Sequence, residues 1–206
     1  MTQIAVFASG KGSNFQTIFK KIQEGYLKCE ISVLISDRPG TGALEFANHN
    51  GITTYIIKQK SFNSPSEFDE KLLEILIKHH INYIILAGYL KKIPDNVISH
   101  FQNKIVNIHP ALLPAFGGKG MYGMHVHDAV FNSGAQFSGV TVHLVNKDYD
   151  AGPVLLQKAV DICQCESAEE IAAKVLAEEH RIYSDALKIL LEKKIVIKGK
   201  RVIIND

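Results

Sequence analysis

Two polar side chains stand at the end of a short apolar segment in the middle of the chain. Asn107 and His109 lie two residues apart in the run that begins at Ile105, so on a strand both side chains point the same way. Pro110 has no N–H and restricts the residue before it, so the strand is predicted to stop at His109. An amide and an imidazole are therefore presented side by side at a strand's end.

A carboxylate from a separate loop completes this set of groups. Asp150 precedes a Gly-Pro pair and is expected to pair with His109 and to raise the pKa of its imidazole. Such a set suits the transfer of an acyl unit to an amine: the amide donates to an oxyanion, and the imidazole moves a proton. The alternative for Asn107 and His109 taken alone is a turn whose polar groups are merely satisfied.

Alternating segments indicate how these groups are positioned. Short β-rich apolar runs alternate with segments of helical spacing, which predicts a Rossmann-like α/β fold. We expect a mostly parallel sheet with helices on both faces and functional loops beyond the carboxyl ends of the strands. The predicted strands are residues 4–8, 31–35, 53–57, 83–87 and 105–108, and the predicted helices are residues 14–24, 43–50, 67–80 and 96–101.

The pattern changes after residue 135. Residues 138–145 and 154–162 are predicted as longer strands, antiparallel to part of the sheet. Ser167 begins a capping-box pattern for a long helix that runs to about Lys193. Two short strands around a turn at residues 198–201 predict a terminal hairpin. The chain shows no linker-like boundary, so residues 1–206 are expected to form a single domain.

Composition excludes several classes of protein. A formal net charge of +2 is too small to predict a nucleic-acid-binding surface. No apolar run is long enough to span a membrane, and the first segment has the pattern of a strand rather than of a secretion signal. Three cysteines without a disulfide pattern favour a reducing, cytoplasmic location.

Two groups of residues raise the question of a metal site. Cys163 and Cys165 have no second Cys/His pair at zinc-ligand spacing, so a metal site there is disfavoured. His125 and His127 lie in a segment, residues 124–131, with helical character, where two residues at this spacing diverge. We therefore expect no metal.

The loop at residues 9–14 follows the first strand and opens a helix, which makes it a candidate anion site. Its glycines allow a tight turn, and the N–H groups at the start of the helix suit a phosphate. The third glycine of a dinucleotide fingerprint would fall at Phe15, so the loop favours a monophosphate over a dinucleotide. Asp37 imitates the ribose-binding acid of such folds but fits a turn residue better.

Five motifs follow one another along the chain: Ser-Gly-x-Gly-Ser-Asn at residues 9–14, Leu-Ala-Gly-Tyr-Leu at 86–90, Asn-Ile-His-Pro-x-Leu-Leu-Pro at 107–114, Val-Thr-Val-His at 140–143 and Asp-Ala-Gly-Pro at 150–153. They occur in the order seen in phosphoribosylglycinamide formyltransferases, of the folate-dependent formyltransferase family, and the chain resembles that family over nearly its whole length. Methionyl-tRNA formyltransferases and formyltetrahydrofolate deformylases share the Asn-x-His…Asp core but carry further domains.

The resemblance implies formyl transfer from 10-formyltetrahydrofolate to glycinamide ribonucleotide in purine synthesis, without a metal, by a monomer or homodimer. Asn107, His109 and Asp150 would be catalytic. A loop from Asn146 to Asp150 would close over the pterin, and His143 would order the site. The resemblance further implies that Gly12, Ser13 and Asn14 hold the ribonucleotide phosphate, that Glu179 binds the ribose, and that Leu90, Lys91, Lys92, Ile93, Asn107, His143 and Asn146 surround the folate.

Alternatives remain at several positions. Without the family, Glu179 is as well explained as a solvated helix residue and His143 as a satisfied core histidine. Two other classes compete for the whole chain: an NAD-dependent oxidoreductase, disfavoured by the missing glycine, and a non-catalytic sugar-phosphate binding module, which would not need the three catalytic groups together.

The chain departs from the family pattern in two places. Residues 116–122 form a glycine-rich insertion relative to shorter members. Relatives commonly carry an arginine just before the third helix, placed to bind the glutamate tail of the folate, whereas residues 62–66 here contain no cation. Lys91 and Lys92 are the nearest candidates by sequence, and they would hold the tail loosely.

Overall fold

The computed structural model describes residues 1–205 and forms two compact units, residues 1–106 and the chain from residue 107 onward. Within residues 1–205, no helix combines the length and the apolar character needed to cross a bilayer. The prediction of one functional domain remains a prediction.

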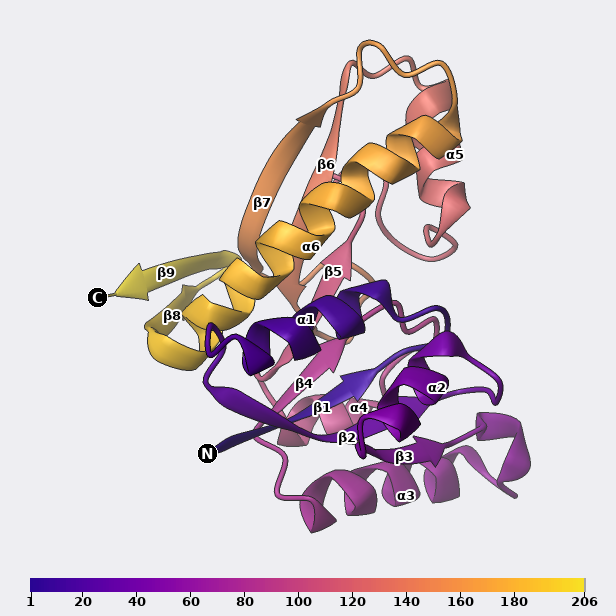
Figure 1. The fold of residues 1–206 in the computed structure, drawn as a ribbon, viewed down its shortest axis with the longest axis vertical. Helices are drawn as coiled ribbons and strands as arrows, with labels where there is room; N and C mark the ends of the chain where they lie inside the picture. Colours follow the sequence, from indigo (N-terminus) through magenta and orange to yellow (C-terminus); the bar gives the residue numbers. More distant parts are fainter. Residues whose placement is uncertain (206) are drawn as a thin grey trace. The chain divides into compact units, whose positions relative to one another are not determined.

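The first unit is a parallel sheet covered by helices, as the sequence predicted (Figure 1). Its strands pair in the order β3-β2-β1-β4, with parallel partners throughout. The strands are β1 (Thr2–Phe7), β2 (Cys29–Ser36), β3 (Thr53–Ile56) and β4 (Tyr83–Leu86), and the helices are α1 (Ser13–Gln23), α2 (Gly42–His49), α3 (Pro65–Lys78) and α4 (Asp95–His100), with a 3₁₀ turn η1 (Gln59–Ser61) that was not predicted.

The strand order reverses after β3, because the chain returns past β2 and β1 to form β4. Right-handed crossovers then place α1 and α2 on one face of this sheet and α3 and α4 on the other. The packing of α1 against α2 and of α3 against α4 agrees with this division. The reversal creates a switch point between β1 and β4, which is where sheets of this kind bind ligands.

Helix α3 illustrates why these segments fold as they do. The Ser64 side chain accepts a hydrogen bond from the N–H of Glu67 at 3.1 Å, and Pro65 occupies the first turn. Both features stabilise a helix start. The apolar stripe of α3 is buried: Phe68, Leu72, Ile75 and Leu76.

The second unit combines a mixed sheet with two helices. Strand β5 (Ile105–His109) leads the chain into it, and the strand order is β5-β6-β7-β9-β8. The β6–β7 and β8–β9 pairs are antiparallel, as predicted, whereas β7 and β9 are parallel neighbours, which the sequence did not predict. The remaining elements are α5 (Met124–Asn132), β6 (Phe137–Leu144), β7 (Val154–Asp161), α6 (Ala168–Glu192), β8 (Lys194–Lys198) and β9 (Arg201–Asn205).

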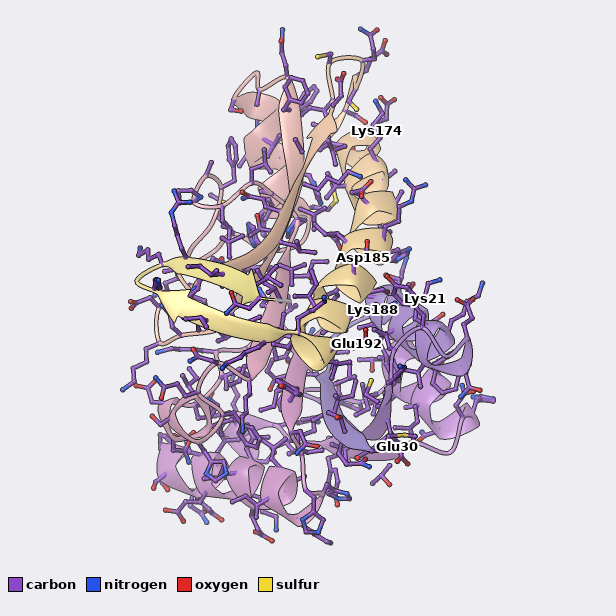
Figure 2. All side chains as sticks on the ribbon, turned by 90° about the vertical axis from the view of Figure 1, so that its left-hand side faces the viewer. Lys21, Glu30, Lys174, Asp185, Lys188 and Glu192 are labelled. Atoms are coloured by element: carbon purple, nitrogen blue, oxygen red, sulfur yellow. The ribbon has the colours of Figure 1, made fainter. Side chains whose placement is uncertain are left out.

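Helix α6 holds the second unit together. It packs against α5, β6 and β7, and Ser167 caps it by accepting from the N–H of Glu170 at 3.2 Å. Its inner face includes Tyr183, which is 1% exposed. Its outer face is charged, as Figure 2 shows for Lys174, Asp185, Lys188 and Glu192.

Candidate functional site

The second unit brings together four predicted site residues from two strands and a loop. Nδ1 of His109, the last residue of β5, lies 3.7 Å from Asp150 Oδ2. Nε2 of His143, near the end of β6, lies 3.6 Å from Asp150 Oδ1. Asn107 Nδ2 lies 3.2 Å from the same His143 nitrogen. The carboxylate of Asp150 therefore stands between two imidazoles, and one of these contacts the amide.

The hydrogen bonds of His143 determine how the Asn107 amide is turned. His143 Nδ1 lies 3.0 Å from the carbonyl oxygen of Leu144, which only accepts, so Nδ1 carries the proton. With the Nδ1–H tautomer Nε2 accepts, and the amide nitrogen of Asn107 faces it at 3.2 Å. This bond uses one N–H of the amide and leaves the second available to an oxyanion. His143, 2% exposed, is thus a satisfied core histidine that also orients Asn107.

The charge on His109 differs from the sequence expectation. Burial lowers the pKa of His109, and this effect outweighs the attraction of Asp150 and the hydrogen bond to Phe116, which both raise it. The sequence argument had the direction of the Asp150 effect right, but the pKa as a whole falls because the ring is only 3% exposed. In the unliganded protein His109 is neutral at neutral pH.

Asp150 remains ionised despite its burial. Burial raises the pKa of its carboxyl, but the neighbouring His143 side chain, the N–H of Gly118 and the nearby His109 ring together hold this pKa below its usual range. A buried carboxylate beside a neutral imidazole will stabilise any proton that reaches the ring. The arrangement suits a proton acceptor that becomes cationic during a reaction.

Backbone groups in the glycine-rich insertion also touch these side chains, and the sequence did not predict this. The carbonyl oxygen of Phe116 lies 2.8 Å from His109 Nε2, and the N–H of Gly118 donates to Asp150 Oδ2 at 2.9 Å. The only sequence signal for this segment was its glycine content, because backbone groups carry no residue-specific mark.

A buried hydroxyl anchors the loop that follows β5. Thr141 Oγ1 donates to the carbonyl of Ala111 and accepts from the N–H of Leu113 at 3.0 Å. The Gln157 side chain donates to the same hydroxyl at 2.8 Å and to the Leu113 carbonyl at 2.9 Å. This network ties the residues after His109 to β6 and β7. It therefore fixes the course of the chain between the imidazole and the insertion.

The predicted phosphate loop lies in the first unit, at the switch point. Gly12 caps α1 with φ +77°, has no side chain to satisfy the first N–H groups, and is followed by a first turn without an acidic residue. An added Cβ at Gly12 would lie 2.8 Å from the Cβ of Ala43 in α2, so both conformation and space require glycine. Ser13 and Asn14 occupy the first turn, where N–H groups suit an anion.

The predicted pterin loop of the first unit is tied to the phosphate loop. The N–H of Ser9 donates to the carbonyl of Gly88 at 3.1 Å, and the N–H of Leu90 donates to the Ser9 hydroxyl at 3.0 Å. The Leu90 side chain is 44% exposed, whereas that of Ile93 is 2% exposed and belongs to the core. Only the backbone of Ile93 is therefore available to a ligand.

The two candidate lysines for the folate tail differ in their surroundings. Both are exposed, but Lys92 Nζ lies 3.5 Å from Asp95 Oδ1, so its charge is partly compensated. Asp37 is also paired: burial raises the pKa of its carboxyl, but hydrogen bonds from Arg38 and Ser9 more than offset this and lower it. It is placed as a turn residue held by its neighbours.

Two further site residues of the second unit lie outside the cluster. Glu179 is 9% exposed on the inner face of α6, so it is not a solvated helix residue. Asn146, in the loop before Asp150, accepts a hydrogen bond from the N–H of Asp148 at 3.1 Å. The side chains of His125 and His127 diverge on α5, as predicted, since the first is exposed and the second buried. Among residues 1–205, no group of three or more His, Cys, Asp and Glu is arranged to hold a metal ion.

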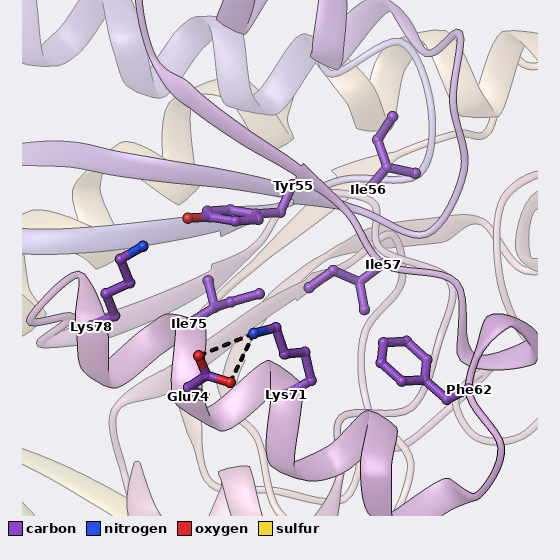
Figure 3. A pocket seen from close by; sticks show the side chains of 8 residues that line it. All are labelled: Tyr55, Ile56, Ile57, Phe62, Lys71, Glu74, Ile75 and Lys78. Atoms are coloured by element: carbon purple, nitrogen blue, oxygen red, sulfur yellow. Dashed lines mark hydrogen bonds and ion pairs between the residues drawn. The ribbon is translucent and has the colours of Figure 1, made fainter.

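A pocket of about 220 Å³ lies between β3 and α3 in the first unit, and none of its lining residues is a predicted site residue (Figure 3). Tyr55, Ile57 and Ile75 form its apolar wall, and Lys71 at its rim pairs with Glu74 at 2.8 Å. It contains no convergent set of groups that could catalyse a reaction.

Comparison with known proteins gives a consistent result. A family model described as formyl transferase matches residues 2–187. The chloroplastic phosphoribosylglycinamide formyltransferase of Vigna unguiculata is 44% identical over 195 residues, which are 94% of this chain and 62% of that protein. The phosphoribosylglycinamide formyltransferase of Bacillus subtilis is 35% identical over 191 residues, 93% of this chain and 95% of that protein. The chain thus spans less than two thirds of its plant relative but nearly all of the bacterial one.

Solved structures agree. The crystal structure of glycinamide ribonucleotide transformylase 1 from Symbiobacterium toebii has a TM-score of 0.93 at 36% identity, covering 100% of this chain and 95% of that one. A formyltetrahydrofolate deformylase from Pseudomonas syringae has a TM-score of 0.88 at 19% identity, covering 100% of this chain and 66% of that one, which is a likeness of fold alone.

Proposed function

Since the chain belongs to the formyl transferase family, we propose that it transfers the formyl group of 10-formyltetrahydrofolate to the amine of glycinamide ribonucleotide. The two units would act as one formyltransferase domain in purine synthesis. The observation that carries the proposal is the cluster of Asn107, His109, His143 and Asp150, because a binding module would not need amide, imidazole and carboxylate in one buried set. We propose that the protein is cytoplasmic and acts as a monomer or homodimer.

The proposed reaction assigns each group of the cluster a task. The amine attacks the formyl carbon, a C–N bond forms, and the carbonyl electron pair moves to oxygen. The second N–H of Asn107 donates to this oxyanion, and the imidazolium that forms at His109 stabilises its charge. The proton lost by the amine passes through His109 to the folate nitrogen as its bond to the formyl carbon breaks. Asp150 stabilises the imidazolium during this passage.

Binding of the two substrates would rest on residues outside the cluster. We propose that Gly12, Ser13 and Asn14 hold the phosphate of the ribonucleotide, and that the buried Glu179 accepts hydrogen bonds from its ribose. The half-exposed Leu90 would be covered by the pterin, with Lys91, Lys92, the Ile93 backbone and Asn146 around it. An apolar side chain left exposed in a loop at a switch point supports this assignment. The reaction as written consumes the folate and needs no metal.

One assay tests the proposal against its alternatives. Protein, glycinamide ribonucleotide and 10-formyltetrahydrofolate are mixed, and the formylated ribonucleotide is followed by mass spectrometry together with the release of tetrahydrofolate. Release of formate without a formylated product would instead indicate a deformylase. Binding of the ribonucleotide without any turnover would indicate a binding module. Reduction of NAD added to the same mixture, in place of formyl transfer, would indicate an oxidoreductase.

Variants of the cluster connect the activity to these residues. His109→Ala and Asn107→Ala should each lower turnover by roughly two or more orders of magnitude, as expected when a proton carrier or an oxyanion donor is removed. Asp128→Asn, which changes an exposed carboxylate on α5, is the matched control and should leave turnover unchanged. A His109→Ala variant with near-normal turnover would rule out the proposed mechanism.

A further inference from the structure

The backbone at residues 116–118 holds both ionisable groups of the proposed reaction at once. The Phe116 carbonyl oxygen lies 2.8 Å from His109 Nε2, and the Gly118 N–H donates to Asp150 Oδ2 at 2.9 Å. The same Asp150 oxygen lies 3.7 Å from His109 Nδ1. One short segment therefore contacts the imidazole on one side and the carboxylate that faces its other side.

Hydrogen-bond chemistry then determines which nitrogen of His109 carries the proton. A carbonyl oxygen only accepts, so the contact with Phe116 requires a proton on Nε2. Burial lowers the pKa of His109, so the ring is neutral and has one N–H. Nδ1 is consequently bare. Nδ1 lies 3.7 Å from Asp150 Oδ2, beyond hydrogen-bond range. This separation is expected when both atoms are acceptors and no proton lies between them.

Backbone conformation and close packing hold residues 116–118 in this position. Phe116 adopts φ +55°, an uncommon conformation for an aromatic residue, and this turns its carbonyl toward the ring. Gly117 lies against Asp150 so closely that an added Cβ would come within 2.4 Å of Leu113 Cδ2 and 3.2 Å of Asp150 Cβ. Gly118 has φ +100°, which favours glycine. Glycine-rich sequence here permits close backbone approach.

We propose that residues 116–118 are a positioning element that holds neutral His109 in its Nε2–H form and so makes Nδ1 the nitrogen that takes and returns the proton during formyl transfer. The inference rests on the proposed function. When the amine attacks, its proton moves to Nδ1, between the ring and Asp150, while Nε2–H stays bonded to Phe116. The proton then leaves Nδ1 for the folate nitrogen as the bond from that nitrogen to the formyl carbon breaks, and the neutral ring is restored.

The tautomer is measured directly in the full chain, labelled with 15N-histidine and studied without ligand at a pH where His109 is neutral. Two-bond 1H–15N correlation spectra separate a protonated from a bare ring nitrogen, and the loss of signals in His109→Asn assigns the residue. We expect a protonated Nε2 and a bare Nδ1. A protonated Nδ1 would overturn the proposal, whatever the activity of the protein.

The catalytic consequence is tested with Gly117→Ala, whose methyl group would lie 2.4 Å from Leu113 Cδ2 and 3.2 Å from Asp150 Cβ, so that the segment or these side chains must shift. The ring should then turn to its Nδ1–H form under the attraction of Asp150, and kcat should fall by about 10²-fold, with KM for the ribonucleotide nearly unchanged. Lys119→Ala, an exposed change in the same insertion, is the control and should keep both the tautomer and kcat. A changed tautomer with wild-type kcat would refute the role of Nδ1.

The spectra also separate this inference from the proposed function. If the wild-type protein shows the Nε2–H form but no formyl transfer, the proposed function fails and the proton-transfer role of Nδ1 fails with it. If formyl transfer is observed and the Nε2–H form is not, the inference alone fails. Should Gly117→Ala not fold, the wild-type spectrum still decides the tautomer.

Discussion

Replacing Asp150 by Asn isolates the electrostatic contribution of the carboxylate. The change conserves shape, and the position has φ +53°, a conformation that Asn adopts as readily as Asp. The amide oxygen can still accept from the N–H of Gly118. We therefore expect the variant to fold, so that loss of charge is the only large change in the site.

The distances give the size of the effect. At 3.7 Å from His109 Nδ1, a carboxylate and an imidazolium attract each other by about 4 kcal/mol at an effective dielectric constant of about 20. An energy of this size corresponds to roughly a 10³-fold change in an equilibrium, since a factor of ten is about 1.4 kcal/mol. Asp150→Asn should therefore lower the pKa of His109 further and reduce kcat by about 10²- to 10³-fold.

The assay is the pH profile of formyl transfer for the wild type, Asp150→Asn and the control Asp128→Asn. The titratable groups around the ring are Asp150, His143 and, from α5, His127. If neutral His109 accepts the proton, activity is lost as pH falls through its pKa, so the acid limb should move to lower pH in Asp150→Asn. A variant within about threefold of wild-type kcat, or an acid limb that moves to higher pH, would refute the electrostatic role.

Three further outcomes are expected. Gly12→Val should weaken ribonucleotide binding in calorimetry and also lower the melting temperature, because its side chain meets α2. Gly10→Ala, with open space around it, should preserve stability. Normal ribonucleotide binding by Gly12→Val would refute the phosphate site. Lys91→Ala should reduce the preference for polyglutamylated folate more than Lys92→Ala, and the preference should weaken with salt; an unchanged preference in the double variant would make both lysines plain surface. The free energy of unfolding should fall as pH drops below about 6.5, because buried histidines of lowered pKa bind protons only when unfolded. His127→Gln should flatten this pH dependence, measured by urea titrations. An unchanged dependence of the free energy of unfolding on pH would show that His127 takes no part.

The fold could largely be predicted because its signals are local. The apolar stripe of α3, the cap at Ser64 and the cap at Ser167 each define an element from a few neighbouring residues. The parallel pairing of β7 with β9 was missed, since it joins segments separated by the whole of α6 and leaves no local pattern. The 3₁₀ turn after β3 was also too short to leave a periodic signal.

The sequence likewise predicts some features of the site and not others. Asn107, His109 and Asp150 were predicted from their chemistry and their places at strand ends and in loops. The direction of the His109 pKa was not, because the sequence shows the neighbouring carboxylate but not the depth at which the ring is buried. Burial is a property of the completed fold, and at this position its effect exceeds that of the nearest charge.

The remaining errors in predicting the site from the sequence concern backbone groups. Glycine content is the sequence feature that indicates where the backbone itself makes such contacts. At Gly12 the missing side chain lets the loop pack against α2 and leaves the start of α1 without a side-chain cap. At Gly117 it lets the chain lie against Asp150, which brings the Phe116 carbonyl to His109. In both places a side chain would occupy the space through which the backbone acts. A glycine-rich insertion beside the proposed catalytic residues is therefore better interpreted as part of the proposed site than as a flexible addition to it.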